Sequence, residues 1–170
     1  MLFLESERLR MVPFTLELVR ATIEDRQKLK ELLQAEVPAN WPNPDFAEVL
    51  PMIAQGMAED PSRPVWDGLI LEKETNRLVG DMGLKGGPDE SGTADMGYSI
   101  VPEYQGRGYA TEMANALIDW CFRETDIVKI TAECLDDNTG SIRVLEKVGL
   151  RRLAPEDNML KWEITKAERV

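Results

Sequence analysis

The six residues from Gln105 to Ala110 read Gln-Gly-Arg-Gly-Tyr-Ala, and their types and spacing suit the binding of an anion. Gly106 and Gly108 expose backbone N–H groups with little side-chain bulk around them. A helix is expected directly after this turn, and the amides of its first turn have no partner within the helix. Arg107 adds a permanent positive charge suited to phosphate. The run therefore predicts a site for a phosphate-bearing ligand, although a glycine turn can equally be only a tight connection.

Two other phosphate motifs do not match this run. A Walker loop needs Gly-Lys-Ser/Thr, which the sequence lacks, and a dinucleotide fingerprint needs a third glycine beyond Gly106 and Gly108. The chain also has no histidine, so the commonest general base and the Ser/His and Cys/His catalytic pairs are excluded. Carboxylates and hydroxyls remain as the groups that could move protons.

The elements on either side of the turn are readable from periodicity. Residues 94–101 alternate between apolar and polar side chains, which predicts a strand, and Pro102 ends it because proline has no N–H to donate. From Ala110 onward the apolar residues recur at helical spacing, which predicts an amphipathic helix ending near Arg123. These apolar residues are Met113, Ala114, Leu117, Ile118 and Cys121.

The rest of the chain predicts an α+β (mixed α/β) fold, with a central mixed, mostly antiparallel sheet of about seven strands flanked by helices. One domain, residues 1–170, is expected from the length. The other expected elements are a strand at 2–11, a helix at 16–21, a second helix that starts at 22 or 24 and is broken by 37–44, a third helix at 46–58, strands at 65–73, 78–84 and 128–135, a helix from 139 to 148, and a closing hairpin of 150–154 with 159–165.

The motif Gln105-x-x-Gly108-x-Ala110 resembles the acyl-CoA-binding signature Q/R-x-x-G-x-G/A of the GNAT superfamily of N-acetyltransferases. With Glu-Arg-Leu-Arg at 7–10, Asn138-x-x-Ser141 and Glu-Lys-Val-Gly-Leu at 146–150, the chain resembles more narrowly the branch of ribosomal-protein N-terminal alanine and serine acetyltransferases. The resemblance implies a single GNAT domain and acetyl-CoA (coenzyme A) as the donor.

In that family the pyrophosphate lies against the glycine turn, and the pantetheine arm pairs with the backbone of the preceding strand. The resemblance carries these cofactor roles onto Tyr98, Ser99, Ile100, Val101, Gln105, Gly106, Arg107, Gly108, Tyr109 and Ala110. Asn138 has two open readings, a cap for the last helix or a ligand of the pantetheine arm. No metal site is expected, because Cys121 and Cys134 lack metal-ligand spacing.

Acetyl transfer to an amine needs a base, and Asp95 is our candidate. Its alternation with apolar neighbours directs Asp95, Gly97 and Ser99 to one face of the strand, and the resembling branch often has an acidic residue there. A solvated aspartate beside a polar loop is the alternative reading. Asp81, on the neighbouring strand, is the rival carboxylate. Glu112 matches a glutamate of the branch but sits where it can simply complement the helix dipole.

The departing thiolate needs a proton, and many GNAT enzymes supply it from a tyrosine in the last helix. The matching position here is Leu145, so the usual acid is missing. Ser141 is the remaining hydroxyl, and solvent is the alternative. Cys134 as an acyl-carrying nucleophile is disfavoured because it alternates with core residues. Trp41 lies in a segment that three prolines break. We expect it to form either a wall of the acceptor pocket or an aromatic plug that pins its loop.

The net charge of −11 argues against nucleic acid and suits cationic amines or basic peptides, although ordinary solubility explains it equally well. No apolar run is long enough to span a bilayer, and the cysteine usage suggests a reducing cytoplasm. The leading function is an N-acetyltransferase acting on a small amine or a protein N-terminus. An oligomeric assembly is compatible with the sequence. The alternative is a GNAT-fold module that binds acyl-CoA without turnover.

Overall fold

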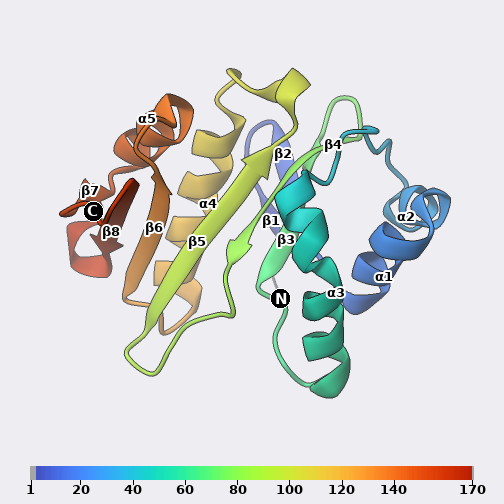
Figure 1. Cartoon of the computed structure of the whole chain (residues 1–170), viewed down its shortest axis with the longest axis horizontal. Helices are drawn as coiled ribbons and strands as arrows, with labels where there is room; N and C mark the ends of the chain where they lie inside the picture. Colours follow the sequence, from blue (N-terminus) through green and yellow to red (C-terminus); the bar gives the residue numbers. More distant parts are fainter. Residues whose placement is uncertain (1–2, 170) are drawn as a thin grey trace. The chain divides into compact units, whose positions relative to one another are not determined.

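The glycine turn lies between strand β5 (Thr93–Ile100) and helix α4 (Tyr109–Glu124) in a computed structural model that describes residues 3–169 (Figure 1). Both elements agree with the prediction to within one residue. A short 3₁₀ turn at Pro102–Tyr104 begins at the proline expected to end the strand. The sequence pattern therefore located the elements that position the turn.

Eight strands are hydrogen-bonded in the order β1-β2-β3-β4-β5-β6-β8-β7. β5 and β6 run parallel, whereas β1–β2, β2–β3, β6–β8 and β7–β8 are antiparallel, so the predicted mixed, mostly antiparallel sheet is confirmed. The other strands are β1 (Leu4–Glu5), β2 (Leu9–Pro13), β3 (Asp67–Glu72), β4 (Arg77–Leu84), β6 (Lys129–Leu135), β7 (Arg151–Arg152) and β8 (Met159–Thr165).

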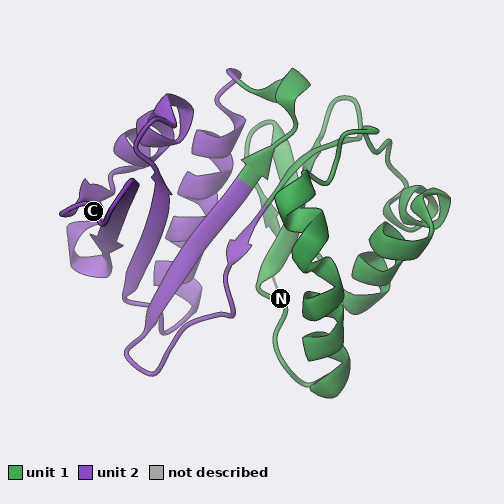
Figure 2. Ribbon diagram, viewed as in Figure 1, with its two compact units in different colours: residues 1–81, 99–105 green, residues 82–98, 106–170 purple. Residues whose placement is uncertain are grey.

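The chain divides into two compact units, shown in green and purple in Figure 2. Unit 1 comprises residues 1–81 and 99–105, and unit 2 comprises residues 82–98 and 106–170. β4 and β5 each contribute residues to both units. The expectation of one domain over 1–170 stays a prediction.

In unit 1, the prediction of a single strand at 2–11 is wrong. The strand expected at 2–11 is two strands, because the chain turns at Ser6, whose N–H donates to Leu9 O at 2.8 Å. β1 then folds back on β2, with Leu4 opposite Met11. The apolar pattern runs through this turn, which is why periodicity alone did not reveal it. The sheet consequently has one strand more than the approximate number expected.

Three helices complete unit 1: α1 (Leu16–Glu24), α2 (Arg26–Leu33) and α3 (Pro44–Glu59). Each begins at a side-chain cap, because Thr15, Asp25 and Asn43 accept from backbone N–H groups of the first turn. α1 packs against both α2 and α3. α1 extends past the expected end at Ala21, and Pro51 lies inside α3 without ending it.

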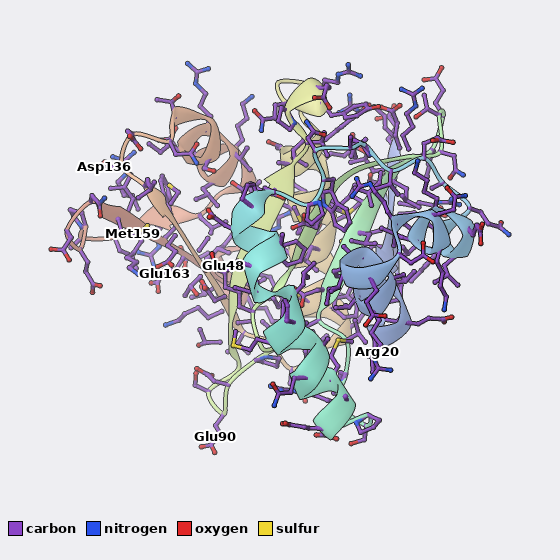
Figure 3. All side chains as sticks on the ribbon, turned by 45° about the vertical axis from the view of Figure 1, so that its right-hand side comes forward. Arg20, Glu48, Glu90, Asp136, Met159 and Glu163 are labelled. Carbon is purple, nitrogen blue, oxygen red and sulfur yellow. The ribbon has the colours of Figure 1, made fainter. Side chains whose placement is uncertain are left out.

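Unit 2 is built on α4, whose five predicted stripe residues are all fully buried. α5 (Thr139–Val148) packs against α4 and β6, and it ends at Gly149, whose φ of 98° is the left-handed conformation expected there. After β6 the chain turns at Asp136, whose N–H donates to Asn158 O at 2.9 Å, close to Met159 (Figure 3). Within the described residues, no helix combines the length and apolarity that a membrane span requires.

Candidate active site

The turn before α4 has the backbone conformation that its glycines make accessible. Gly106 and Gly108 have φ angles of 77° and 81°, in the left-handed region that favours glycine. A Cβ at Gly106 would meet no atom within 4 Å, so the space beside the turn is open. Gly108 is the N-cap residue of α4 and supplies no capping side chain. The first-turn amides of α4 and the positive end of its dipole would suit an anion, and the anion site stays a prediction.

β5 and β6 pair over only a short stretch and then separate. Their parallel pairing covers Thr93–Asp95 and Lys129–Thr131. Both strands continue beyond the last pair, β5 to Ile100 and β6 to Leu135. The two facing strand edges beyond the pairing can therefore offer backbone N–H and C=O groups to a bound chain.

The orientation of the β5 backbone follows from its bonds to β4. Asp95 O accepts from Lys85 N at 2.8 Å, and Val101 N donates to Val79 O at 2.8 Å. Backbone groups alternate sides along a strand, so those of Tyr98 are directed to the edge facing β6. The backbone of Tyr98 is therefore oriented as its predicted cofactor role requires. The N–H of Val101 is already bonded within the sheet and cannot donate to a cofactor.

Two further predicted cofactor residues have partners within unit 1. Gln105 donates from its side-chain nitrogen to Ile100 O at 3.0 Å, which ties the start of the turn to the end of β5. Ser99 donates from its hydroxyl to Asp81 Oδ2 at 2.8 Å. Gln105 thus has a structural contact in addition to its predicted cofactor role.

Asp95 is held by two contacts within unit 2. Its Oδ1 accepts from the Thr131 hydroxyl at 2.8 Å, and its Oδ2 lies 3.4 Å from Lys85 Nζ. The Asp95 side chain is 39% exposed, so a substrate can reach it. A fixed and accessible carboxylate fits the role of a general base, which stays a prediction.

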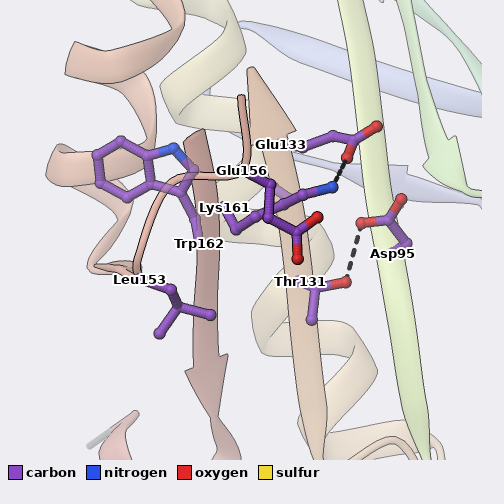
Figure 4. Close-up of a pocket in the computed structure, with 8 residues that line it drawn as sticks. Asp95, Thr131, Glu133, Leu153, Glu156, Lys161 and Trp162 are labelled. Atoms are coloured by element: carbon purple, nitrogen blue, oxygen red, sulfur yellow. Dashed lines mark hydrogen bonds and ion pairs between the residues drawn. The ribbon is translucent and has the colours of Figure 1, made fainter. Parts of the chain in front are cut away.

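Beside Asp95, unit 2 has a pocket of about 400 Å³ (Figure 4). Its lining is Asp95, Thr131, Ala132, Glu133, Leu153, Glu156, Lys161 and Trp162. Lys161 donates to Glu133 and keeps the pKa of that carboxyl below its usual value, so Glu133 is ionised at neutral pH. Three carboxylates and one lysine give the wall a net negative charge, which suits a cationic acceptor.

Of the residues that line this pocket, only Asp95 is predicted from the sequence to be functional. Period-two alternation within 128–135 already directs Thr131 and Glu133 to one face of their strand. The missing information was that β6 lies beside β5, which places Thr131 opposite Asp95. Alternation gives the face of a strand, but strand pairing depends on contacts between distant residues.

On α5, Asn138 is confirmed as the helix cap, because its Oδ1 accepts from Ser141 N at 3.1 Å. Its second predicted role, in holding pantetheine, stays a prediction. Leu145, at the position where the family resemblance implies a tyrosine, is 1% exposed. Ser141 is on the first turn of α5, and its hydroxyl lies near that of Tyr98. Burial raises the pKa of Tyr98, and the Ser141 hydroxyl partly opposes this rise.

In unit 1, Trp41 and Asp81 contact each other directly. Trp41 Nε1 donates to Asp81 Oδ2 at 2.9 Å, and the indole ring is 2% exposed. Phe14 and Phe46 pack around it, with ring centroids 6.1 and 6.4 Å from that of Trp41. This geometry matches an aromatic plug that pins the loop before α3. Acceptor binding by Trp41 and Asp81 stays a prediction.

The buried carboxyl of Asp81 has a pKa raised to about 6, mainly because burial disfavours its charged form. Hydrogen bonds from Trp41 and Ser99 oppose this rise, and the nearby Asp67 charge adds to it. A folded-state pKa above the unfolded value means that Asp81 contributes stability at acidic pH, below the unfolded value near 4. That contribution is lost as pH rises through about 6.

We therefore expect Asp81→Asn to change how the free energy of unfolding depends on pH. Relative to the variant, the wild type should lose about 2–3 kcal/mol between pH 4 and pH 7, because asparagine has no proton to release. Denaturant unfolding of both proteins at intervals of pH measures this. Parallel curves for the two proteins would contradict the assignment of the raised pKa to Asp81.

Both cysteines are free and buried, as the alternation pattern predicted for Cys134. Burial raises the pKa of the Cys121 thiol to about 12, so it is not a nucleophile at neutral pH. Cys134 is 7% exposed. Neither thiol has the accessibility expected of an acyl-carrying group.

Comparison with known proteins places this arrangement in a family. Residues 13–151 match the model described as acetyltransferase (GNAT) domain. The N-acetyltransferase YjdG of Bacillus subtilis is 35% identical over 151 residues, which cover 88% of this chain and 89% of that protein.

Among solved structures, RimL, a ribosomal L7/L12 α-N-protein acetyltransferase in complex with coenzyme A, is 19% identical with a TM-score of 0.70, covering 96% of this chain and 97% of that one. A spermidine N-acetyltransferase SpeG chimera from Vibrio cholerae and hSSAT is 14% identical with a TM-score of 0.69, covering 95% and 98%. These two likenesses concern the fold. The family-model match and the relative, each spanning most of the chain, show that this chain belongs to the GNAT family and is an acetyl-CoA-dependent acyltransferase.

Proposed function

We propose that the chain transfers the acetyl group of acetyl-CoA to a primary α-amine at a protein N-terminus, by direct attack of the amine in a ternary complex. The observation that carries this proposal is Asp95, a fixed and accessible carboxylate in the wall of a negatively charged pocket. A positioned base of this kind contributes about 10²–10⁴-fold to a rate.

The residues of the glycine turn would hold the donor. The amides at 106–110 and the charge of Arg107 fit a pyrophosphate, and the unpaired β5 edge at Tyr98 fits the amide groups of a pantetheine arm. Acetyl-CoA supplies a thioester whose carbonyl carbon accepts an amine. The contribution of the chain is to hold that carbon beside the amine, which is worth about 7–11 kcal/mol when positioning is good.

The choice of an α-amine follows from the cost of making an amine neutral. At pH 7 an α-amine with a pKa near 8 costs about 1 kcal/mol to deprotonate, whereas a lysine side chain with a pKa near 10.4 costs about 4.6 kcal/mol. The chain has no histidine, and Asp95 is the carboxylate that we assign as the general base. An α-amine, which loses its proton more easily than lysine, is therefore the acceptor that Asp95 serves best. The ribosomal-protein enzyme with a similar fold, RimL, is described as acting on α-amines.

Direct attack is supported by the state of the thiols. An acyl-enzyme route through cysteine needs an accessible thiolate, and both cysteines are buried. Two free thiols also fit a reducing compartment, and we place the protein in the cytoplasm on that basis.

Small cationic amines are a second acceptor class, favoured by the net negative lining of the pocket. Release of free coenzyme A thiol would be followed with three acceptors: a lysine-free peptide with an open N-terminus, the same peptide with a blocked N-terminus and one lysine, and spermidine. We expect fast release only with the first. Fast release only with spermidine would move the function to the second class, and binding of acetyl-CoA with no release would favour a module without turnover.

A further inference from the structure

The predicted proton donors for the departing thiolate are Ser141 and solvent. The position where the family resemblance implies a tyrosine is Leu145, a core residue with no proton to give. A serine hydroxyl alone is a weak acid, because its proton is much less acidic than that of a phenol or a thiol. A stronger donor near the diverging ends of β5 and β6 would complete the chemistry.

Tyr98 has a phenol, which is a stronger acid than serine, and it lies where β5 diverges from β6. It lies on β5 beyond the last residue paired with β6, and its Oη is fully buried. Among the described residues, no hydrogen bond of good geometry reaches this Oη, although the Ser141 hydroxyl lies close to it. A buried phenol that is not well hydrogen-bonded is costly in a folded protein, so it calls for an explanation.

Two groups lie around the Tyr98 hydroxyl within unit 2. The Ser141 hydroxyl on α5 is near enough to lower the pKa of Tyr98, and Cys134 on β6 is the other titratable neighbour that affects it. Burial outweighs Ser141 and raises the pKa of Tyr98 above its usual value, so the phenol keeps its proton at neutral pH. Ser141 has its backbone N–H bonded to Asn138, which fixes the start of its helix.

We propose that the buried hydroxyl of Tyr98 is the general acid that protonates the leaving sulfur, with Ser141 returning a proton to it from solvent. This inference rests on the proposed acetyl transfer. When the C–S bond of the thioester breaks, its electron pair stays on sulfur and the proton of Tyr98 Oη moves to that sulfur. The Ser141 hydroxyl then gives its proton to the phenolate and takes one from water, and the hydroxide left behind is neutralised by the proton that the amine releases.

The first test is Tyr98→Phe, which removes only the hydroxyl and keeps the ring. We expect kcat to fall by about tenfold or more, with the Kd for coenzyme A nearly unchanged. Tyr104→Phe is the matched control, because it also removes a tyrosine hydroxyl, one that binds Arg77, and its kcat should stay near that of the wild type. Ser141→Ala should lower kcat less than Tyr98→Phe, because water can replace the serine as the source of the returning proton.

A second test separates acid catalysis from a structural role of the hydroxyl. Site-specific fluorotyrosine at position 98 gives a more acidic phenol, and ¹⁹F NMR of the protein without substrates reports its pKa directly. We expect Ser141→Ala to raise that pKa, since Ser141 lowers it, and we expect kcat of the fluorinated enzyme to fall as pH rises through the measured pKa. A hydroxyl needed only for packing would give no such fall.

The outcomes distinguish this inference from the function on which it rests. An active wild type with an unchanged Tyr98→Phe enzyme would overturn the role of Tyr98 alone. A fluorotyrosine enzyme whose kcat ignores the phenol pKa would do the same. A wild type that binds acetyl-CoA but transfers acetyl to no amine would overturn the proposed function, whereas the ¹⁹F pKa shift on Ser141→Ala would still establish the contact.

Discussion

Asp95→Asn is expected to lower kcat/KM at pH 7 by about 10²–10⁴-fold, because it replaces the base with a nearly isosteric group that accepts no proton. The loss should shrink as pH rises, since a growing fraction of the acceptor amine is then already neutral. Steady-state acetylation of an N-terminal peptide between pH 6 and pH 9 measures both effects. Thermal melting checks that the variant is folded.

Asp119→Asn is the matched control for the change in charge. Asp119 is also an aspartate of unit 2 in an ion pair, 2.9 Å from Arg169, and it has no proposed part in catalysis. Thr131→Val removes the hydroxyl that holds Asp95 and should give a smaller loss than Asp95→Asn. A large loss at Asp81→Asn with a silent Asp95→Asn would move the base to Asp81. A loss at Asp95 that is equal at every pH would indicate binding of a cationic acceptor instead of proton removal.

Gly108→Asn is expected to weaken acetyl-CoA binding by about 10–100-fold. Asparagine tolerates the left-handed φ of 81° better than other residues with a side chain, so the turn should keep its shape. Its side chain would compete for the first-turn amides of α4, and losing one charge-assisted hydrogen bond to phosphate costs about 1.5–3 kcal/mol. Isothermal titration with acetyl-CoA measures the change in Kd.

Gly86→Asn gives the comparison for this variant. Gly86 also has a positive φ, 71°, and a Cβ there would meet no atom within 4 Å, so the substitution imposes a similar backbone cost in the loop after β4. Its Kd for acetyl-CoA should equal that of the wild type. If Gly108→Asn binds as tightly as Gly86→Asn, the phosphates do not lie against the amides of this turn.

The turn and its helix could be predicted because their signals are local. A glycine is needed where φ is positive, and Gly106 and Gly108 meet that need within three residues. The buried stripe of α4 follows from a repeat that the sequence displays directly. Gly149 as the end of α5 and Asn138 as its cap are predictions of the same kind, and the structure confirms both.

Contacts between distant residues could not be predicted in this way. Trp41 and Asp81 were each singled out, but the bond between them joins positions 40 residues apart. Alternation grouped Tyr98 with the apolar residues of its strand, and nothing local revealed that its hydroxyl would lie beside Ser141. The pocket beside Asp95 likewise depends on which strand pairs with β5 and where that pairing ends.

The most direct measurement uses one peptide with a free N-terminus and a single internal lysine. After incubation with acetyl-CoA at pH 7, mass spectrometry of the fragments shows which amine carries the acetyl group. We predict acetylation of the α-amine, in excess over the lysine by on the order of 100-fold, because the neutral fraction of the two amines differs by about that factor. Acetylation of the lysine in preference to the α-amine would contradict the assignment of the acceptor and of Asp95 as a base suited to it.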